Sequence, residues 1–139
     1  MTILLTGGAG YIGAITNKYL VEKGYKTVIF DNFITGHTES IEATPYVNGD
    51  ICRKVDIEII FQNYDIDGVI HFAARALAGE SMIKPNLYYE TNVLGMVNLL
   101  EVMQQNECFN IVFSSSCSVY GFPETLPVKE EMAYAPLSV

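Results

Sequence analysis

The sequence predicts an open α/β domain with a parallel, doubly wound sheet. Five short apolar runs alternate with stretches of helical periodicity, an order typical of right-handed βαβ crossovers. Several runs are β-branched or aromatic throughout, as expected of strands that are covered on both faces. A glycine-rich segment directly follows the first run. The strand order 3-2-1-4-5 accounts for this pattern, and we expect the sheet to be truncated after about the fifth strand, without the sixth strand of this architecture.

The five apolar runs mark the expected strands. They are Thr2–Thr6, Lys26–Phe30, Pro45–Asn48, Gly68–Phe72 and Asn110–Phe113. The third run is the weakest of the five. Each run is short enough for a strand and too short for a typical helix.

Three stretches between the runs predict helices. In the first, one apolar stripe recurs at i, i+3, i+7 and i+8, and Gly24 can close the helix; its members are Ile12, Ile15, Tyr19 and Leu20. The second stretch is Cys52–Asn63, with Val55, Ile59 and Ile60 expected to face inward. The third and longest is Asn86–Asn106, preceded by Pro85, which is tolerated at a helix start. Its expected inner positions are Leu87, Val93, Val97, Leu100 and Met103.

The composition fits one domain with a buried core. Half of the 139 residues are apolar and 17% are charged, which argues against disorder. No apolar run approaches the roughly 20 residues that span a bilayer, and the first residues carry neither a basic region nor a cleavage site of a secretory signal. We therefore expect no membrane partner.

Charge and cysteine content exclude other function classes. Sixteen acidic against eight basic side chains give a net charge of −8, and no basic face for nucleic acid is visible. We interpret the acidity as an aid to solubility. The three cysteines, Cys52, Cys108 and Cys117, are odd in number and widely spaced. They fit neither a disulfide framework nor a metal site such as zinc, which favours a reduced, cytoplasmic location.

The clearest functional signal is the segment Thr6–Gly13, Thr-Gly-Gly-Ala-Gly-Tyr-Ile-Gly. Its glycines are spaced G-x-x-G-x-x-G between a strand and a helix: Gly7 permits a tight turn, Gly10 lets a pyrophosphate approach the backbone, and Gly13 lets the helix lie close to the sheet. The amides of Tyr11 and Ile12 then point at the phosphates, aided by the helix dipole. The motif needs a strand before it and a helix after it, and the sequence predicts both. The segment therefore predicts a Rossmann-type dinucleotide site rather than a merely structural turn.

Asp31 identifies the expected dinucleotide. It closes the second strand about twenty residues after the glycines, where a carboxylate accepts bonds from the adenosine ribose and repels a 2′-phosphate. This favours NAD over NADP. The alternative is that Asp31 or Asn32 only caps a turn. Asp50 could meet the adenine, or belong to an ordinary Asn-Gly-Asp turn.

Polar residues near the strand ends are the candidates for chemistry. The cluster Ser114–Ser118 lies at the carboxyl end of the fifth strand, where open α/β sheets place their active sites. A serine cluster can equally be a loop or a cap. His71 lies within an apolar strand, so we interpret it as a buried, satisfied histidine rather than an acid or base. His37 lies in a polar loop and indicates nothing further.

Taken together, these motifs resemble the UDP-glucose 4-epimerases, also called UDP-galactose 4-epimerases, which are extended short-chain dehydrogenase/reductase enzymes of galactose metabolism. The resemblance covers essentially the whole chain and is carried by motifs in the family's order. They are Thr6–Gly13, Asp31-Asn32, Gly49-Asp50-Ile51, His71-Phe72-Ala73-Ala74, Gly79-Glu80-Ser81, Phe113–Ser116 and Val119-Tyr120-Gly121.

The resemblance implies a reaction and roles for individual residues. Such enzymes keep NAD bound, oxidise the sugar of a UDP-sugar at C4 and return the hydride to the opposite face. By position, Ser116 resembles the serine that assists proton transfer, and Ser114 would lie by the nicotinamide. The implied cofactor contacts elsewhere are Asp31 and Asn32 at the ribose, Asp50 and Ile51 at the adenine, and Phe72, Ala73 and Asn92 around the cofactor.

The chain departs from the family pattern at two positions that contact the cofactor in relatives. Ala76, with Arg75 beside it, stands where many relatives have a lysine, which puts that cofactor contact in doubt. Thr91 stands where an asparagine often contacts NAD, with Asn92 beside it.

The largest departure is that the family's Tyr-x-x-x-Lys is absent after the fifth strand, where the family has it; the only such spacing, Tyr19–Lys23, lies in the first predicted helix. Glu130-Glu131 and Pro136–Val139 resemble the segment that precedes it, but Tyr120 and Tyr134 are followed by Glu124 and Ser138 at the lysine position. We expect residues 1–139 to be a partial NAD-binding domain that lacks the sugar-nucleotide domain, binds NAD and barely turns over. An apolar face of the last strand and its helix should also be bare.

Two other functions stay open at this level. A nucleotide-sugar dehydratase of the same superfamily would need an acidic residue beside the serines, where this chain has Cys117 and Ser118. A non-catalytic dinucleotide-binding module would leave the serines without a role. Family members are commonly homodimers, and the helix from Asn86 resembles one of the paired helices.

Overall fold

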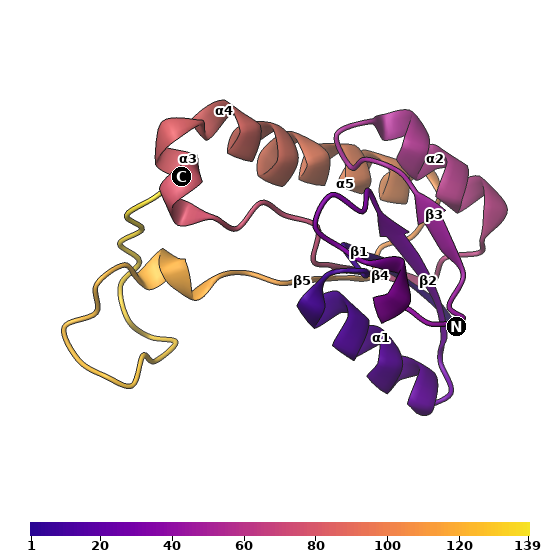
Figure 1. Cartoon of the computed structure of the whole chain (residues 1–139), viewed down its shortest axis with the longest axis horizontal. Coiled ribbons are helices and arrows are strands. Elements are labelled where there is room, and N and C mark those ends of the chain that lie inside the picture. Colours follow the sequence, from indigo (N-terminus) through magenta and orange to yellow (C-terminus); the bar gives the residue numbers. More distant parts are fainter.

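The computed structural model describes residues 1–139 and contains one five-stranded parallel sheet (Figure 1). The strand order is β3-β2-β1-β4-β5, which confirms the predicted order. All four strand pairs are parallel, as crossovers through helices require. The strands are β1 (Thr2–Thr6), β2 (Lys26–Asp31), β3 (Tyr46–Asn48), β4 (Gly68–His71) and β5 (Ile111–Phe113).

Helices cover both faces of the sheet. Figure 1 shows α1 (Tyr11–Glu22) on one face and α2 (Lys54–Asn63) with α5 (Gly95–Gln105) on the other. The long helix predicted from Asn86 is continuous, because α4 (Pro85–Tyr88) passes through the π-helical turn η2 (Tyr89–Leu94) into α5 with helical backbone angles at both junctions. Three short elements were not expected: η1 (Thr38–Ser40), α3 (Ala78–Ile83) and η3 (Cys117–Tyr120). None of the helices is long and apolar enough to cross a membrane.

Alternating strand residues divide the core into two unequal parts. Leu4, Val28 and Val69 contribute to the larger cluster, which α2 and α5 complete with Ile57, Leu99 and other side chains. On the opposite face lies a smaller cluster of Ile3, Leu5, Ala9, Ile29 and Ile41. The size difference follows from the helices, since two helices cover one face and α1 lies on the other.

Of the predicted apolar stripe of α1, only Leu20 packs against the core. Ile12, Ile15 and Tyr19 are each more than half exposed, whereas Gly13, Ala14 and Asn17 are buried. A Cβ atom on Gly13 would lie 2.7 Å from the Cα atom of Gly8 and closer still to the Gly7 carbonyl oxygen. This close approach fixes the rotation of the helix, so the small residues face inward and the large ones face solvent.

The inward faces predicted for the other two helices were also partly wrong. Ile60 and Met103 are buried as expected and Leu87 is half-buried, but Val55 and Ile59 of α2 and Val93, Val97 and Leu100 of the long helix are exposed. The buried positions are instead Ile57 and Phe61 in α2 and Tyr88, Gly95, Leu99 and Val102 in the long helix. A Cβ on Gly95 would lie 2.7 Å from the Ile51 side chain, so this glycine sets which face of α5 meets the core.

The long helix therefore carries a second apolar face that nothing in the chain covers. Tyr89, Val93, Val97 and Leu100 follow one another at helical spacing and are 56%, 52%, 45% and 43% exposed. We call these four residues the exposed helix stripe. Val112 and Phe113 of the edge strand β5 are exposed as well, in agreement with the bare strand face that the sequence predicted.

Candidate functional site

A cavity of about 390 Å³ opens at the carboxyl edge of the sheet. Residues that follow four neighbouring strands line it, because the carboxyl ends of parallel strands meet at one edge. They are Gly7 and Gly10 after β1, Phe30–Asn32 at the end of β2, Gly49–Ile51 after β3, and Phe72–Leu77 after β4. Ile34, Thr35, Glu80, Tyr88 and Thr91 complete the wall. The glycine turn and Asp31, which the sequence singles out separately, thus border one cavity.

The three glycines of the turn have distinct geometric roles. Gly7 has φ +70°, and a Cβ there would lie 2.6 Å from the Ala73 amide nitrogen, so both the backbone conformation and the contact with the loop after β4 require glycine. Gly13 brings the helix against the turn itself rather than against the sheet. Gly10 is different, since a Cβ there would come no closer than 3.3 Å to any protein atom. Its missing side chain leaves free space in the cavity.

The amino end of α1 offers unpaired amides at this turn. The N-cap residue Gly10 provides no side chain, and the first turn contains no acidic residue. The first intrahelical bond runs from the Ala14 amide to the Gly10 carbonyl, so the amides of Tyr11, Ile12 and Gly13 have no intrahelical acceptor. The Tyr11 side chain is 83% exposed and Ile12 also faces solvent. Only their backbone amides can serve an anion here.

Asp31 joins the second strand to the glycine turn. Its Oδ2 accepts a hydrogen bond from the Ala9 amide at 3.0 Å and its Oδ1 accepts one from the Phe33 amide at 2.9 Å. The carboxylate therefore caps the turn after β2, which was the alternative interpretation. It also lines the cavity, and each carboxylate oxygen retains a lone pair for a further donor. Asn32 lines the cavity as well and accepts a bond from the Ile34 amide.

The end of β3 supplies a second acidic group. Asp50 Oδ1 accepts a bond from the Cys52 amide at 2.9 Å, in the Asx turn that the sequence allowed. The Asp50 amide is itself held by Asp56, and the neighbouring Ile51 is buried. Burial, followed by the nearby Asp50, raises the pKa of the Cys52 thiol to about 11. Cys52 is therefore a neutral thiol and no nucleophile at neutral pH.

The loop after β4 forms the cavity wall opposite α1, and hydrogen bonds from Asn92 hold its backbone. The Phe72 amide donates to the Thr6 carbonyl, which places Phe72 and Ala73 beside the glycine turn. Asn92 Oδ1 accepts from the Arg75 amide at 2.8 Å, and its Nδ2 donates to the Arg75 carbonyl at 3.0 Å. Asn92 is not among the residues that line the cavity, whereas its neighbour Thr91 is, and the predicted cofactor contact of Asn92 stays a prediction.

The serines lie further along the same sheet edge. The Ser114 amide donates to the His71 carbonyl where β5 leaves the sheet. Ser116 caps η3, since its Oγ accepts from the Ser118 amide and lies 2.7 Å from Ser118 Oγ. Both side chains are exposed and lie outside the cavity wall. Their hydroxyls are therefore open to solvent.

His71 is a structural residue, as the sequence indicated. It is 2% exposed, its Nδ1 lies 2.6 Å from Thr6 Oγ1, and its ring stacks on Phe113 at 5.7 Å. Burial lowers the pKa of His71 from 6.5 to about 4. The folded chain therefore holds a neutral imidazole in the pH range where an unfolded histidine becomes protonated.

We expect His71 to make the chain sensitive to acid. Because the unfolded state takes up a proton below pH 6.5 and the folded state resists until about pH 4, stability is lost as the pH falls between these values. From pH 7 to pH 5 the loss attributable to this group is about 2 kcal/mol. Urea titrations at both pH values should show a smaller loss in His71→Asn, which can keep the Thr6 hydrogen bond. Equal losses in both proteins would contradict this assignment.

A polar cluster that the sequence did not predict lies at the far end of the cavity. Glu80 Oε2 accepts a bond from Tyr88 Oη at 2.9 Å and lies 3.7 Å from Arg75 Nη1, while its Oε1 lies 3.7 Å from Lys84 Nζ. Burial, followed by the adjacent Glu80, raises the pKa of Tyr88. The only available signal was the Gly79-Glu80-Ser81 motif, to which we assigned no role.

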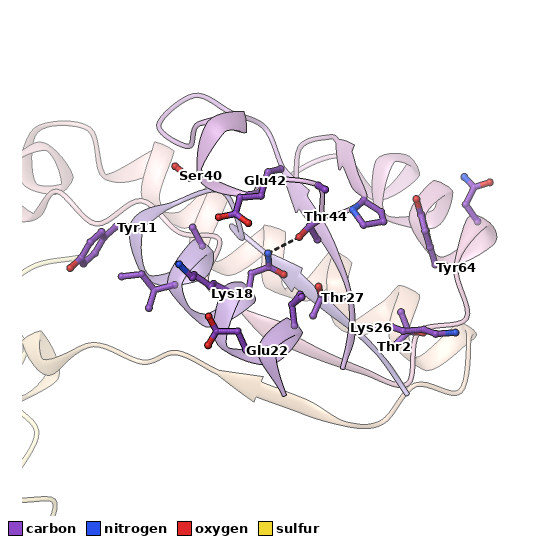
Figure 2. A pocket seen from close by; sticks show the side chains of 18 of the residues that line it. Thr2, Tyr11, Lys18, Glu22, Lys26, Thr27, Ser40, Glu42, Thr44 and Tyr64 are labelled. Carbon is purple, nitrogen blue, oxygen red and sulfur yellow. Dashed lines mark hydrogen bonds between the residues drawn. The ribbon is translucent and has the colours of Figure 1, made fainter. Parts of the chain in front are cut away.

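A larger groove of about 900 Å³ lies on the other side of α1 (Figure 2). Its walls are α1, including Lys18 and Glu22, and the segment 40–45 that leads into β3. It reaches Thr2 and Lys26 at the amino ends of their strands, away from the edge where such sheets bind ligands. It contains no glycine turn. On these grounds, the smaller cavity at the carboxyl edge is the candidate site.

Two buried polar atoms beneath the groove lack partners. Asn17 Nδ2 donates to Thr44 Oγ1 at 2.8 Å, but Asn17 Oδ1 and Thr27 Oγ1 have no hydrogen bond. An unpaired buried hydroxyl is costly. We therefore expect Thr27→Val, which keeps the shape of the side chain on β2, to raise the free energy of unfolding by about 1 kcal/mol. Urea denaturation measures this, and a loss of stability would indicate that the hydroxyl has a partner such as a bound water.

Comparison with known proteins agrees with this geometry. A sequence model described as the NAD dependent epimerase/dehydratase family matches residues 3–139. The chain belongs to this family. The UDP-glucose 4-epimerase of Halalkalibacterium halodurans is 43% identical over 130 residues, which are 94% of this chain and 39% of that protein. The chain thus spans about two fifths of the length of this relative.

Solved structures of family members have the same fold. The UDP-glucose 4-epimerase from Brucella ovis in complex with NAD is 40% identical and superposes with a TM-score of 0.93, covering 99% of this chain and 42% of that one. The UDP-glucose 4-epimerase from Thermotoga maritima with UDP-glucose is 31% identical, with a TM-score of 0.91 over 99% of this chain and 46% of that one. The Rossmann-type sheet predicted from the sequence is therefore that of the epimerase structures.

Proposed function

We propose that this chain is the NAD-binding domain of an enzyme that interconverts UDP-glucose and UDP-galactose. The observation that carries the proposal is the cavity in which the glycine turn, the amino end of α1 and Asp31 converge. Relatives with NAD or UDP-glucose in their structures support it. The whole protein's activity is inferred from these relatives, since the chain matches only part of each.

The residues present fit a dinucleotide. Gly10 leaves space at the turn, and the free amides of α1 can hold a pyrophosphate. Asp31 and Asn32 would take the adenosine ribose, with Asp50 and Ile51 beside the adenine. Phe72 and Ala73 would border the cofactor between the turn and β5. NAD, when bound, accepts a hydride from the sugar C4 and returns it.

We propose that two serines after β5 act where the sugar substrate meets the cofactor. Ser116 would hydrogen-bond the reacting sugar hydroxyl and assist proton transfer, and Ser114 would lie by the nicotinamide. Both hydroxyls are exposed at the edge of the sheet next to the cavity. The one Tyr-x-x-x-Lys in these 139 residues is Tyr19–Lys23, which lies at α1 and not after β5, so we propose that the base which removes the hydroxyl proton lies outside them.

The exposed helix stripe supports a dimer. Four apolar side chains in line on one helix present an unpaired face, and such faces mark sites of association. We propose that the whole protein is a cytoplasmic homodimer that pairs through this helix.

Two experiments test the function. The complete gene product is expected to convert UDP-galactose into UDP-glucose, whereas the 139-residue chain with added NAD is expected to bind the cofactor and form almost no product. Clear product from the chain alone would contradict the proposal that the base lies outside these residues. A dehydrated sugar from the complete protein would identify a dehydratase instead. If the coding sequence continues past Val139, it is expected to encode Tyr-x-x-x-Lys. A continuation without this motif would favour a non-catalytic module.

A further inference from the structure

The cavity at the carboxyl edge contains one basic side chain among its lining residues. This is Arg75, and the same cavity is lined by three carboxylates, those of Asp31, Asp50 and Glu80. A dinucleotide brings two further negative charges in its pyrophosphate. The amino end of α1 supplies only about half a unit charge. Arg75 is therefore the one positively charged side chain at the cavity that can offset these negative charges.

The backbone of Arg75 is fixed next to the glycine turn. A Cβ on Gly7 would lie 2.6 Å from the Ala73 amide nitrogen, so the loop after β4 abuts the turn two residues before Arg75. Asn92 then holds both the amide and the carbonyl of Arg75. The side chain consequently begins from a defined point on the wall opposite α1, within the reach of an arginine from the turn.

The guanidinium is only loosely engaged. Its Nη1 lies 3.7 Å from Glu80 Oε2, beyond hydrogen-bond distance, and the side chain is 35% exposed. Glu80 has other partners, because Tyr88 Oη donates to it at 2.9 Å and Lys84 Nζ lies 3.7 Å away. If Arg75 turns toward the cavity, Glu80 keeps a hydrogen bond and a cation. The movement therefore leaves no carboxylate without a partner.

We propose that Arg75 is the cation that binds the cofactor's pyrophosphate, from the side opposite the amino end of α1. This inference rests on the proposed binding of NAD and adds a specific residue to it. The planar guanidinium can donate two parallel hydrogen bonds to phosphate oxygens. The Asn92 clamp holds the loop in place while the side chain exchanges Glu80 for the phosphates.

The test compares ligands with and without a pyrophosphate. Calorimetry on the 139-residue chain measures Kd for NAD, ADP-ribose and adenosine in the wild type, Arg75→Gln and Arg75→Lys. Arg75→Gln is expected to weaken NAD and ADP-ribose about 10- to 100-fold and to leave adenosine unchanged. Arg75→Lys should bind NAD more tightly than Arg75→Gln and more weakly than the wild type, because lysine keeps the positive charge but cannot donate two parallel hydrogen bonds. Lys84→Gln, which removes the other cation facing Glu80 but lies outside the cavity wall, is the matched control and should bind like the wild type.

Each outcome decides a separate question. A wild type that binds no NAD overturns the proposed function and this inference with it. Wild-type binding with unchanged affinity in Arg75→Gln overturns the role of Arg75 alone. An equal loss for adenosine and ADP-ribose also overturns it, because it would show that the substitution disturbs the loop. Should Arg75→Gln fail to fold, as judged by its thermal transition, Arg75→Lys still has to bind NAD more weakly than the wild type and adenosine equally well.

Discussion

Replacing Gly13 with alanine is expected to lower both the stability of the chain and its affinity for NAD. The added Cβ would meet the Gly7 carbonyl oxygen and the Gly8 Cα, which are backbone atoms that cannot move independently of the turn. Overpacking of this kind costs about 3 kcal/mol. The displaced turn would also misdirect the free amides of α1. Losing two amide bonds to a charged phosphate weakens binding by about 100-fold or more.

Two other glycines serve as controls for Gly13→Ala. Gly10 has φ −74° and its Cβ would meet only the Gly7 carbonyl oxygen, at 3.3 Å, so Gly10→Ala should lose less stability than Gly13→Ala and still lose NAD affinity through the methyl group in the cavity. Gly79 in α3 has nothing within 4 Å of a Cβ, so Gly79→Ala should leave the NAD affinity unchanged and lose no stability, because alanine favours the helix more than glycine. Urea denaturation and calorimetry measure the two effects. Near-native stability in Gly13→Ala would contradict the geometry of the turn.

Removing the charge of Asp31 is expected to have the second large effect. In Asp31→Asn one carboxylate oxygen becomes a donor, so the Ala9 or the Phe33 amide loses its acceptor, and the ribose hydroxyls lose charged acceptors. We expect the NAD affinity to fall about 100-fold. NADP should be affected less, because the substitution also removes the repulsion of the 2′-phosphate. The ratio of the two Kd values therefore moves toward one.

Calorimetric titrations with NAD and NADP measure this ratio directly. Asp65→Asn is the control, since this exposed carboxylate lies in the other groove and should leave both Kd values unchanged. If Asp31→Asn weakens both cofactors equally, Asp31 acts only as the turn cap and does not select the cofactor.

The sheet and the glycine turn were predictable because their signals are local. Each strand contains a short apolar run, weakest in β3, and the alternation with helices is typical of a parallel sheet. The spacing of Gly7, Gly10 and Gly13 likewise depends on backbone geometry, which acts within a few residues. These features needed no knowledge of distant contacts.

The helix faces were harder to predict because two glycines decide them. Large apolar residues lie on more than one side of α1 and α5, so periodicity alone cannot tell which side meets the sheet. The close approach of Gly13 to the turn and of Gly95 to Ile51 selects the buried side. Such contacts join residues that are distant in the sequence, or they depend on the absence of a side chain.

The far end of the cavity was missed for a related reason. Arg75, Glu80 and Tyr88 come from a loop and two short helices, where no regular period places side chains together. Asn92 shows the same limitation, since only the structure reveals that its amide hydrogen-bonds the backbone of Arg75.

An NMR titration of the ¹⁵N-labelled 139-residue chain with NAD tests the central claim most directly. The claim is that the dinucleotide binds at the carboxyl edge of the sheet, between the glycine turn and Asp31. It predicts saturable shifts of the amides of Gly7–Gly13, Asp31, Asp50 and Ile51, and weaker shifts with NADP. The absence of shifts, or shifts confined to Asn17, Thr27 and Thr44 in the groove on the other side of α1, would contradict it.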